Sequence, residues 1–170
     1  FSEAASHNKV SEDCLTLNIW AGDIEKPKKP IMFYIHGGGF AFGGSADPLY
    51  DGQYLVREHK DVVMISTNYR IGMMGFIDFT GIPGGEEYPE GQFLGLLDII
   101  QSLKWVHENA ESFGGDPDNI TIFGESAGGN LVSVLLVCDG VEGLFKRAIA
   151  HSGTLNLTFT EETLAADAAS

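Results

Sequence analysis

The sequence predicts an α/β fold in which a mostly parallel sheet carries helices on both faces. Short apolar or β-branched runs alternate along the chain with segments of helical periodicity. Polar or glycine-rich clusters directly follow four of the apolar runs, as expected where parallel strands deliver their loops to one edge. The 170 residues are enough for one domain with a hydrophobic core.

Five segments have the composition of strands. The first alternates apolar and polar residues, whereas the later ones are continuous apolar runs typical of buried parallel strands. These predicted strands are residues 14–20, 31–35, 62–67, 120–123 and 148–150.

Three segments are predicted helices: residues 49–59, 91–112 and 127–136. In the second helix six apolar residues recur at helical spacing, namely Phe93, Leu96, Leu97, Ile100, Leu103 and Val106. Residues 72–91 contain many glycines and two prolines, which predicts a long irregular loop. The acidic, alanine-rich tail from Thr158 predicts the start of another helix.

The turn from the strand 120–123 into the helix 127–136 is the stretch that carries chemistry. It reads Gly124-Glu125-Ser126-Ala127-Gly128 and matches the pattern G-x-S-x-G. Glycines on both flanks let the chain turn sharply, so that the hydroxyl of Ser126 is exposed at the sheet edge beside a helix N-terminus. The position predicts that Ser126 is a nucleophile.

A second glycine cluster, His36 to Phe40, follows the strand 31–35. Its backbone N–H groups are not hidden by side chains, as in the oxyanion holes of lipases and esterases. We therefore predict that Gly38, Gly39 and Ala127 donate to a developing oxyanion. A bare glycine turn with a surface serine is the alternative interpretation of both clusters.

A serine nucleophile needs a base, and in hydrolases of this architecture the acid and the histidine follow the serine along the chain. Only His151 follows Ser126 at the correct edge, and no strand pair that could carry an acid lies between them. His36 is expected to brace the glycine cluster. The sequence therefore leaves the catalytic base and acid unassigned.

Composition excludes several functional classes. A formal net charge of −14 and the absence of a basic stripe argue against nucleic-acid binding. No apolar run is long enough to span a membrane, so the chain is expected to be soluble, whether secreted or cytoplasmic. Cys14 and Cys138 match neither a disulfide framework nor a metal site, and no metal or organic cofactor is expected.

These features together resemble the type-B carboxylesterases, the cholinesterase-like branch of the α/β-hydrolases. The resemblance rests on matching segments that cover most of residues 12–153 in the family's order. They are the motif from Glu12 to Asn18, His36 to Phe40, Asn68 to Arg70, Gly95 to Asp98, Phe113 to Gly129 and Leu144 to Ile149.

The resemblance implies roles for individual residues. Ser126 is implied to be the nucleophile, with Gly38, Gly39 and Ala127 as the oxyanion hole. Glu125 is implied to be a buried supporting carboxylate, and Arg70 with Asp98 to be a structural ion pair. The cysteine that matches Cys14 bonds an upstream cysteine in secreted animal members, and its disulfide state here is left open.

Members of this family are several times longer than this chain. Residues 1–170 are therefore expected to be the amino-terminal part of one α/β-hydrolase catalytic domain, without its extreme start. A further chain or fragment of the same polypeptide is expected to supply the triad Glu and His, so that this piece alone would be nearly inactive.

The expected function is hydrolysis of a small-molecule carboxylic ester through an acyl-serine intermediate. One alternative is a lipase-like relative of the hormone-sensitive type, which shares the glycine cluster and the serine turn. Another is a non-catalytic adhesion protein that keeps the fold, although such members lack the serine. Nothing in the sequence selects the acyl or alcohol group.

Overall fold

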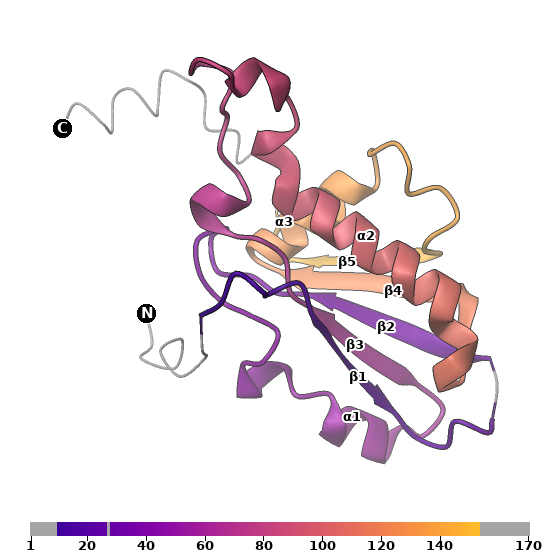
Figure 1. Ribbon diagram of the computed structural model, residues 1–170. Helices are drawn as coiled ribbons and strands as arrows, with labels where there is room; N and C mark the ends of the chain where they lie inside the picture. Colours follow the sequence, from indigo (N-terminus) through magenta and orange to yellow (C-terminus); the bar gives the residue numbers. More distant parts are fainter. Residues whose placement is uncertain (1–9, 27, 154–170) are drawn as a thin grey trace.

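The computed structural model describes residues 10–26 and 28–153 of the chain, and these form a five-stranded sheet (Figure 1). Its order is β1-β3-β2-β4-β5. The strand β1 runs antiparallel to β3, and every other neighbouring pair is parallel. The strands are β1 (Leu17–Ala21), β2 (Lys29–Ile35), β3 (Val63–Thr67), β4 (Gly115–Glu125) and β5 (Arg147–His151).

Helices cover both faces of this sheet, as the sequence predicts. The α-helices are α1 (Gln53–Glu58), α2 (Leu94–Asn109) and α3 (Ala127–Leu135). Short 3₁₀ turns occupy Pro48–Tyr50, Gly72–Met74, Gly85–Glu87, Gly91–Phe93 and Ala110–Phe113. The acidic tail predicted to be helical lies outside the described residues.

The faces of the sheet follow from the alternation of side chains along β2. Ile31, Phe33 and Ile35 point to one face and are fully buried in the main core, which α2 and α3 complete. Met32 and Tyr34 point to the other face, where they join a smaller cluster with Val56 of α1. Figure 1 shows α1 beside β1 and β3, with α2 crossing the sheet further up.

Two helix boundaries differ from the predictions for local reasons. The predicted helix 49–59 is split, because Asp47 and Asp51 each accept a hydrogen bond from the backbone two residues on, which begins a new turn each time. The predicted helix 91–112 is α-helical only over α2, with 3₁₀ turns at both ends. The strand predicted at 120–123 is longer, because Gly115 pairs with Lys29.

An ion pair fastens α2 to the segment that follows β3. Arg70 donates from Nε and Nη2 to the two carboxylate oxygens of Asp98, at 2.7 and 2.6 Å, and its backbone N–H adds a third bond at 3.0 Å. The side chain of Asp98 is 6% exposed, and this hydrogen bonding raises the pKa of Arg70 above its usual value. The predicted structural ion pair is therefore confirmed.

We expect Asp98→Asn to lower the free energy of unfolding of the full-length protein by about 2 kcal/mol, because a guanidinium loses its charged partner at a largely dry site. Arg70 keeps some contact with solvent, which holds the cost below that of a wholly buried pair. Urea denaturation measures the change. The matched control is Asp23→Asn, which breaks the exposed pair with Lys26 and should cost less than about 0.5 kcal/mol. Equal effects of the two variants would contradict the assignment.

Candidate active site

The clusters that follow the strands meet at one edge of the sheet, as the parallel topology predicts. The backbone N–H of Ser126 donates to the carbonyl of His151 at 2.9 Å, which joins the ends of β4 and β5. The hydroxyl of Tyr69 donates to the carbonyl of His36 at 2.6 Å, which joins the ends of β3 and β2. A Cβ built on Gly37 would lie 3.2 Å from Cβ of Ser126, so the glycine cluster touches the serine turn directly.

Ser126 occupies a strained turn between β4 and α3. Its φ of 57° and ψ of −122° are unusual for a residue with a side chain. The backbone is held there from both sides, because the N–H bonds His151 and the carbonyl accepts from the N–H of Asn130 at 3.0 Å. The side chain is partly exposed rather than packed into the core. This conformation matches the sharp strand-to-helix turn on which α/β-hydrolases carry a serine.

The glycines around Ser126 are required by close backbone approaches. A Cβ on Gly128 would lie 2.1 Å from the carbonyl oxygen of Ile35, and one on Gly124 would lie 2.6 Å from the carbonyl carbon of Gly128. A Cβ on Gly129 would meet the carbonyl oxygen of His151 at 2.6 Å. The start of α3 is therefore seated against the ends of two strands at a distance that side chains would not permit.

The predicted oxyanion donors belong to two segments, the loop after β2 and the first turn of α3. Gly38 and Gly39 have φ values of 114° and 59°, which turn the chain after β2. Among the described residues, the hydrogen bonds of the loop use the carbonyl of Gly38 but neither N–H of these two glycines. Ala127 is the first residue of α3, where an N–H has no partner within the helix. The loop that carries Gly38 and Gly39 approaches Ser126 at Gly37, and Ala127 directly follows Ser126.

His36 braces this loop from the interior, as expected. It is 1% exposed, its Nδ1 lies 2.8 Å from the carbonyl oxygen of Gly37, and its ring stacks on Tyr69 with 4.3 Å between ring centroids. Burial lowers the pKa of His36, and the bond to Gly37 opposes that shift only in part. The imidazole is therefore a neutral, structural group near pH 7.

Glu125 corrects one expectation. The resemblance implied a buried carboxylate beside the serine, but Glu125 is exposed in the described structure. It is the last residue of β4, and its strand partner on the outer side, His151, is itself exposed. The carboxylate still lies near the glycine cluster, since Oε2 would be 3.3 Å from a Cβ on Gly37. The pKa of Tyr34 is raised mainly by burial, and the negative charge of Glu125 makes a smaller contribution in the same direction.

No base for Ser126 can be identified among the described residues. His151 reaches Ser126 through its backbone carbonyl, and its side chain is exposed on the strand β5. His59 and His107 lie at or within helices α1 and α2 rather than at the edge that carries Ser126. The assignment of the base therefore stays open, as it does from the sequence.

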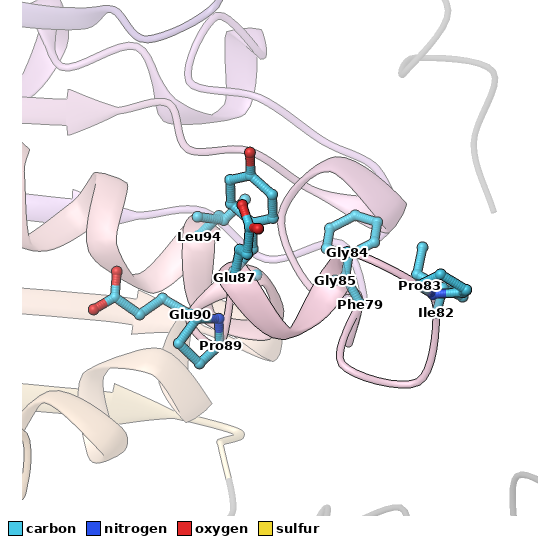
Figure 2. A pocket seen from close by; sticks show the side chains of 11 residues that line it. Phe79, Ile82, Pro83, Gly84, Gly85, Glu87, Pro89, Glu90 and Leu94 are labelled. Carbon is cyan, nitrogen blue, oxygen red and sulfur yellow. The ribbon is translucent and has the colours of Figure 1, made fainter.

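A cavity of about 530 Å³ lies in the long loop between β3 and α2, and its lining does not include Ser126 (Figure 2). Phe79, Ile82, Tyr88 and Leu94 provide its apolar lining, and Glu87 and Glu90 add carboxylates. Only the start of this loop reaches the site, where the ring of Phe76 meets that of Phe40 edge to face at 5.3 Å. The cavity is thus separate from the serine turn.

Three further observations concern the residues that the structure describes. They contain no cluster of three or more potential metal ligands. None of their helices has the length and apolar character needed to cross a membrane. Cys14 and Cys138 are both free thiols there.

Sequence reasoning missed a polar network that holds Ser45, five residues beyond the glycine cluster. The carboxamide of Asn18 donates to both oxygens of Ser45 and to the hydroxyl of Ser66. The N–H of Ser45 donates to Oδ1 of Asn68 at 2.8 Å. Asn18 and Asn68 belong to motifs that the resemblance highlighted, but nothing in the sequence marked Ser45 as their partner.

The sheet, its helices and the serine turn define an α/β-hydrolase, of which this chain forms part. The sequence model of the carboxylesterase family matches residues 1–169. The chain therefore belongs to the carboxylesterase family, and the resemblance to its cholinesterase-like branch is confirmed by the relatives.

Two curated relatives illustrate the similarity. The para-nitrobenzyl esterase of Bacillus subtilis (strain 168) is 44% identical over 161 residues, which cover 95% of this chain and 32% of the relative. The cholinesterase of Mus musculus is 46% identical over 151 residues, which cover 88% of this chain and 24% of the relative. The chain thus spans a third or less of the length of these proteins.

Solved structures agree with the fold. The Geobacillus stearothermophilus carboxylesterase EST55 superposes with a TM-score of 0.77 at 48% identity, covering 82% of this chain and 29% of that one. A structure of PNB esterase superposes with a TM-score of 0.79 at 44% identity, covering 94% of this chain and 33% of that one.

We expect Gly128→Ala to destabilise the full-length protein by about 3 kcal/mol, because the new methyl group meets a backbone carbonyl that cannot rotate away. Urea denaturation again measures the loss. Gly81→Ala is the matched control: a Cβ there meets nothing within 4 Å, and its φ lies outside the left-handed region. A Gly128→Ala protein as stable as the Gly81→Ala protein would show that α3 can move away from β2.

Stability should also fall on mild acidification because of His36. Its pKa is lowered in the folded protein, whereas in the unfolded chain it is about 6.5. Below pH 6.5 the unfolded chain therefore binds the proton more readily, and protonation favours unfolding. Unfolding free energies measured between pH 8 and pH 5.5 should fall less in His36→Gln than in the unmodified protein. The same slope in both would contradict the burial of a neutral imidazole.

Proposed function

We propose that the protein containing this chain is a serine carboxylesterase that hydrolyses small-molecule esters through an acyl-serine intermediate. The observation that carries the proposal is the position of Ser126. Ser126 lies on a strained turn, directly before Ala127 and against Gly37 of the glycine-rich loop. Among the described residues, the N–H groups of Gly38 and Gly39 in this loop donate no backbone hydrogen bond. Membership of the carboxylesterase family supports the same reaction class.

In the proposed acylation step, Oγ of Ser126 attacks the ester carbonyl carbon while its proton passes to a base. The carbonyl oxygen becomes an oxyanion that accepts hydrogen bonds from Gly38, Gly39 and Ala127. Each such donor contributes about 3 kcal/mol when it is aimed at the oxyanion. Collapse of the tetrahedral intermediate breaks the bond to the alcohol oxygen, and the base returns its proton to the departing alcohol.

Deacylation repeats these events with water. The base removes a proton from water as the water oxygen attacks the acyl carbon, and the proton then returns to Oγ of Ser126 as the carboxylic acid leaves. The chemistry requires no metal or organic cofactor. The carboxylate of Glu125 is proposed to support this edge of the site from the end of β4.

The base and its orienting acid are proposed to be a His and a Glu from the part of the polypeptide outside this chain. The relatives are at least three times as long as the matched segment. The 170-residue piece alone is accordingly expected to be nearly inactive. Because those relatives are named for different alcohols, para-nitrobenzyl and choline, the proposal stays at the level of carboxylic esters.

The full-length protein treated with a fluorophosphonate should carry one adduct, on Ser126, when its peptides are analysed by tandem mass spectrometry. In Ser126→Ala the adduct should be absent, and kcat for p-nitrophenyl butyrate should fall more than about 1,000-fold, because no nucleophile is left.

Ser112→Ala is the control for this experiment, since Ser112 is an exposed serine beyond α2 whose hydroxyl bonds the carbonyl of Asn109. It should label and turn over like the unmodified protein. A folded full-length protein that shows neither labelling nor turnover would overturn the proposed function.

A further inference from the structure

The segment that follows β3 touches the glycine-rich loop at three separate points. We call residues 36–45 the glycine loop and residues 68–72 the clamp segment. These three contacts join the two segments directly, although more than 20 residues separate them along the chain. The clamp segment is itself fixed, because Arg70 is anchored to Asp98 of α2.

The first contact holds the entry of the glycine loop. Tyr69 is 3% exposed, and its hydroxyl donates to the carbonyl oxygen of His36 at 2.6 Å. The tyrosine ring also lies nearly parallel to the imidazole of His36, with an interplanar angle of 20°. Burial raises the pKa of Tyr69 well above its usual value, so the hydroxyl keeps its proton and acts as a donor. Both the backbone and the ring of His36 are thus held by one side chain.

The second contact holds the exit of the loop. Oδ1 of Asn68 accepts from the backbone N–H of Ser45 at 2.8 Å, and the carboxamide of Asn68 is oriented by a bond from Nδ2 to the hydroxyl of Thr16 at 3.0 Å. Ser45 is 3% exposed, and its carbonyl accepts from Asn18 and from Ser66. The end of the loop is therefore tied to β1 and β3 together.

The third contact lies between the other two. The N–H of Gly72 donates to the carbonyl oxygen of Phe40 at 2.5 Å. Phe40 has a φ of 62°, which is unfavourable for an aromatic residue, and it directly follows Gly38 and Gly39, which also have positive φ. The N–H groups of Ala41 and Phe42 close a turn on the carbonyl of Gly38, and the bond from Gly72 holds this turn from outside the loop.

We propose that Tyr69 is a positioning residue for the proposed esterase reaction. Through His36 it sets the direction in which the N–H groups of Gly38 and Gly39 point. This inference rests on the proposed function, in which those N–H groups bind the oxyanion. Oxyanion donors act only when they lie within about 2.7–3.1 Å of the developing charge, so a small rotation of the loop reduces the rate without removing any catalytic group.

Tyr69→Phe in the full-length protein tests the proposal, because it keeps the stacked ring and removes only the hydroxyl. We expect kcat for p-nitrophenyl butyrate to fall about 10- to 100-fold while KM changes less than about twofold. The affinity for a trifluoromethyl ketone, which forms an oxyanion on the serine, should weaken by a similar factor. A role in folding alone would not produce this selective loss.

The matched control is Tyr54→Phe, since Tyr54 is an exposed tyrosine on α1. Its kcat and inhibitor affinity should equal those of the unmodified protein. Active sites are counted with the fluorophosphonate, so that kcat refers to folded enzyme only. If Tyr69→Phe keeps kcat and ketone affinity within twofold per active site, the positioning role is overturned.

A second pair of variants keeps the test decisive should Tyr69→Phe not fold. Asn68→Asp retains an oxygen that accepts from the N–H of Ser45, whereas Asn68→Leu removes it. The Leu variant should show the selective loss of kcat and ketone affinity, and the Asp variant should restore most of both. Equal activity in the two variants would show that contacts from the clamp segment do not position the glycine loop, which overturns the proposal. The proposed function, by contrast, would be overturned if the unmodified protein showed no ester turnover, or if its turnover persisted in Ser126→Ala.

Discussion

The contact between the start of α3 and the end of β2 is the constraint on which the rest of this structure depends. At Gly128 the helix backbone lies so close to the carbonyl of Ile35 that no side chain fits between them. This contact brings the first turn of α3 over the sheet edge and forces Ser126 into its strained φ. Because the backbones of α3 and β2 touch at this point, Ser126 and Ala127 lie beside the glycine loop that follows β2.

The glycine loop has a different basis, since hydrogen bonds hold it both from within and from outside. Residues with positive φ follow one another from Gly38 to Phe40. The N–H groups of Ala41 and Phe42 donate to the carbonyl of Gly38, and further bonds come from the clamp segment, which the Arg70–Asp98 pair secures to α2. The serine turn is thus set by steric contact, whereas the loop opposite it is set by directional hydrogen bonds. The proposed reaction needs both, because the oxyanion would form between them.

Much of this arrangement could be predicted from the sequence, for identifiable reasons. The apolar runs predicted the strands and the helical spacing predicted α2, since burial on a sheet or a helix leaves a periodic pattern. The glycines flanking Ser126 predicted a tight turn. The partner of Asn68 could not be predicted, because a hydrogen bond between Ser45 and a residue 23 positions away leaves no local pattern. The exposure of Glu125 was missed because the expectation came from longer relatives.

The side of the sheet that ends in β5 is exposed in the described residues, and these residues offer no base for Ser126. The outer strand β5 has four exposed residues of five, and apolar side chains such as Ile149 and Val137 are exposed at 40% and 78%. Sheet edges of this kind are normally covered or paired, because unpaired backbone groups and apolar surface favour association. A strand added beside β5 would pair with its free backbone edge and lie next to His151. It would also place further loops at the edge that carries Ser126, which is where a histidine must arrive to act on its hydroxyl.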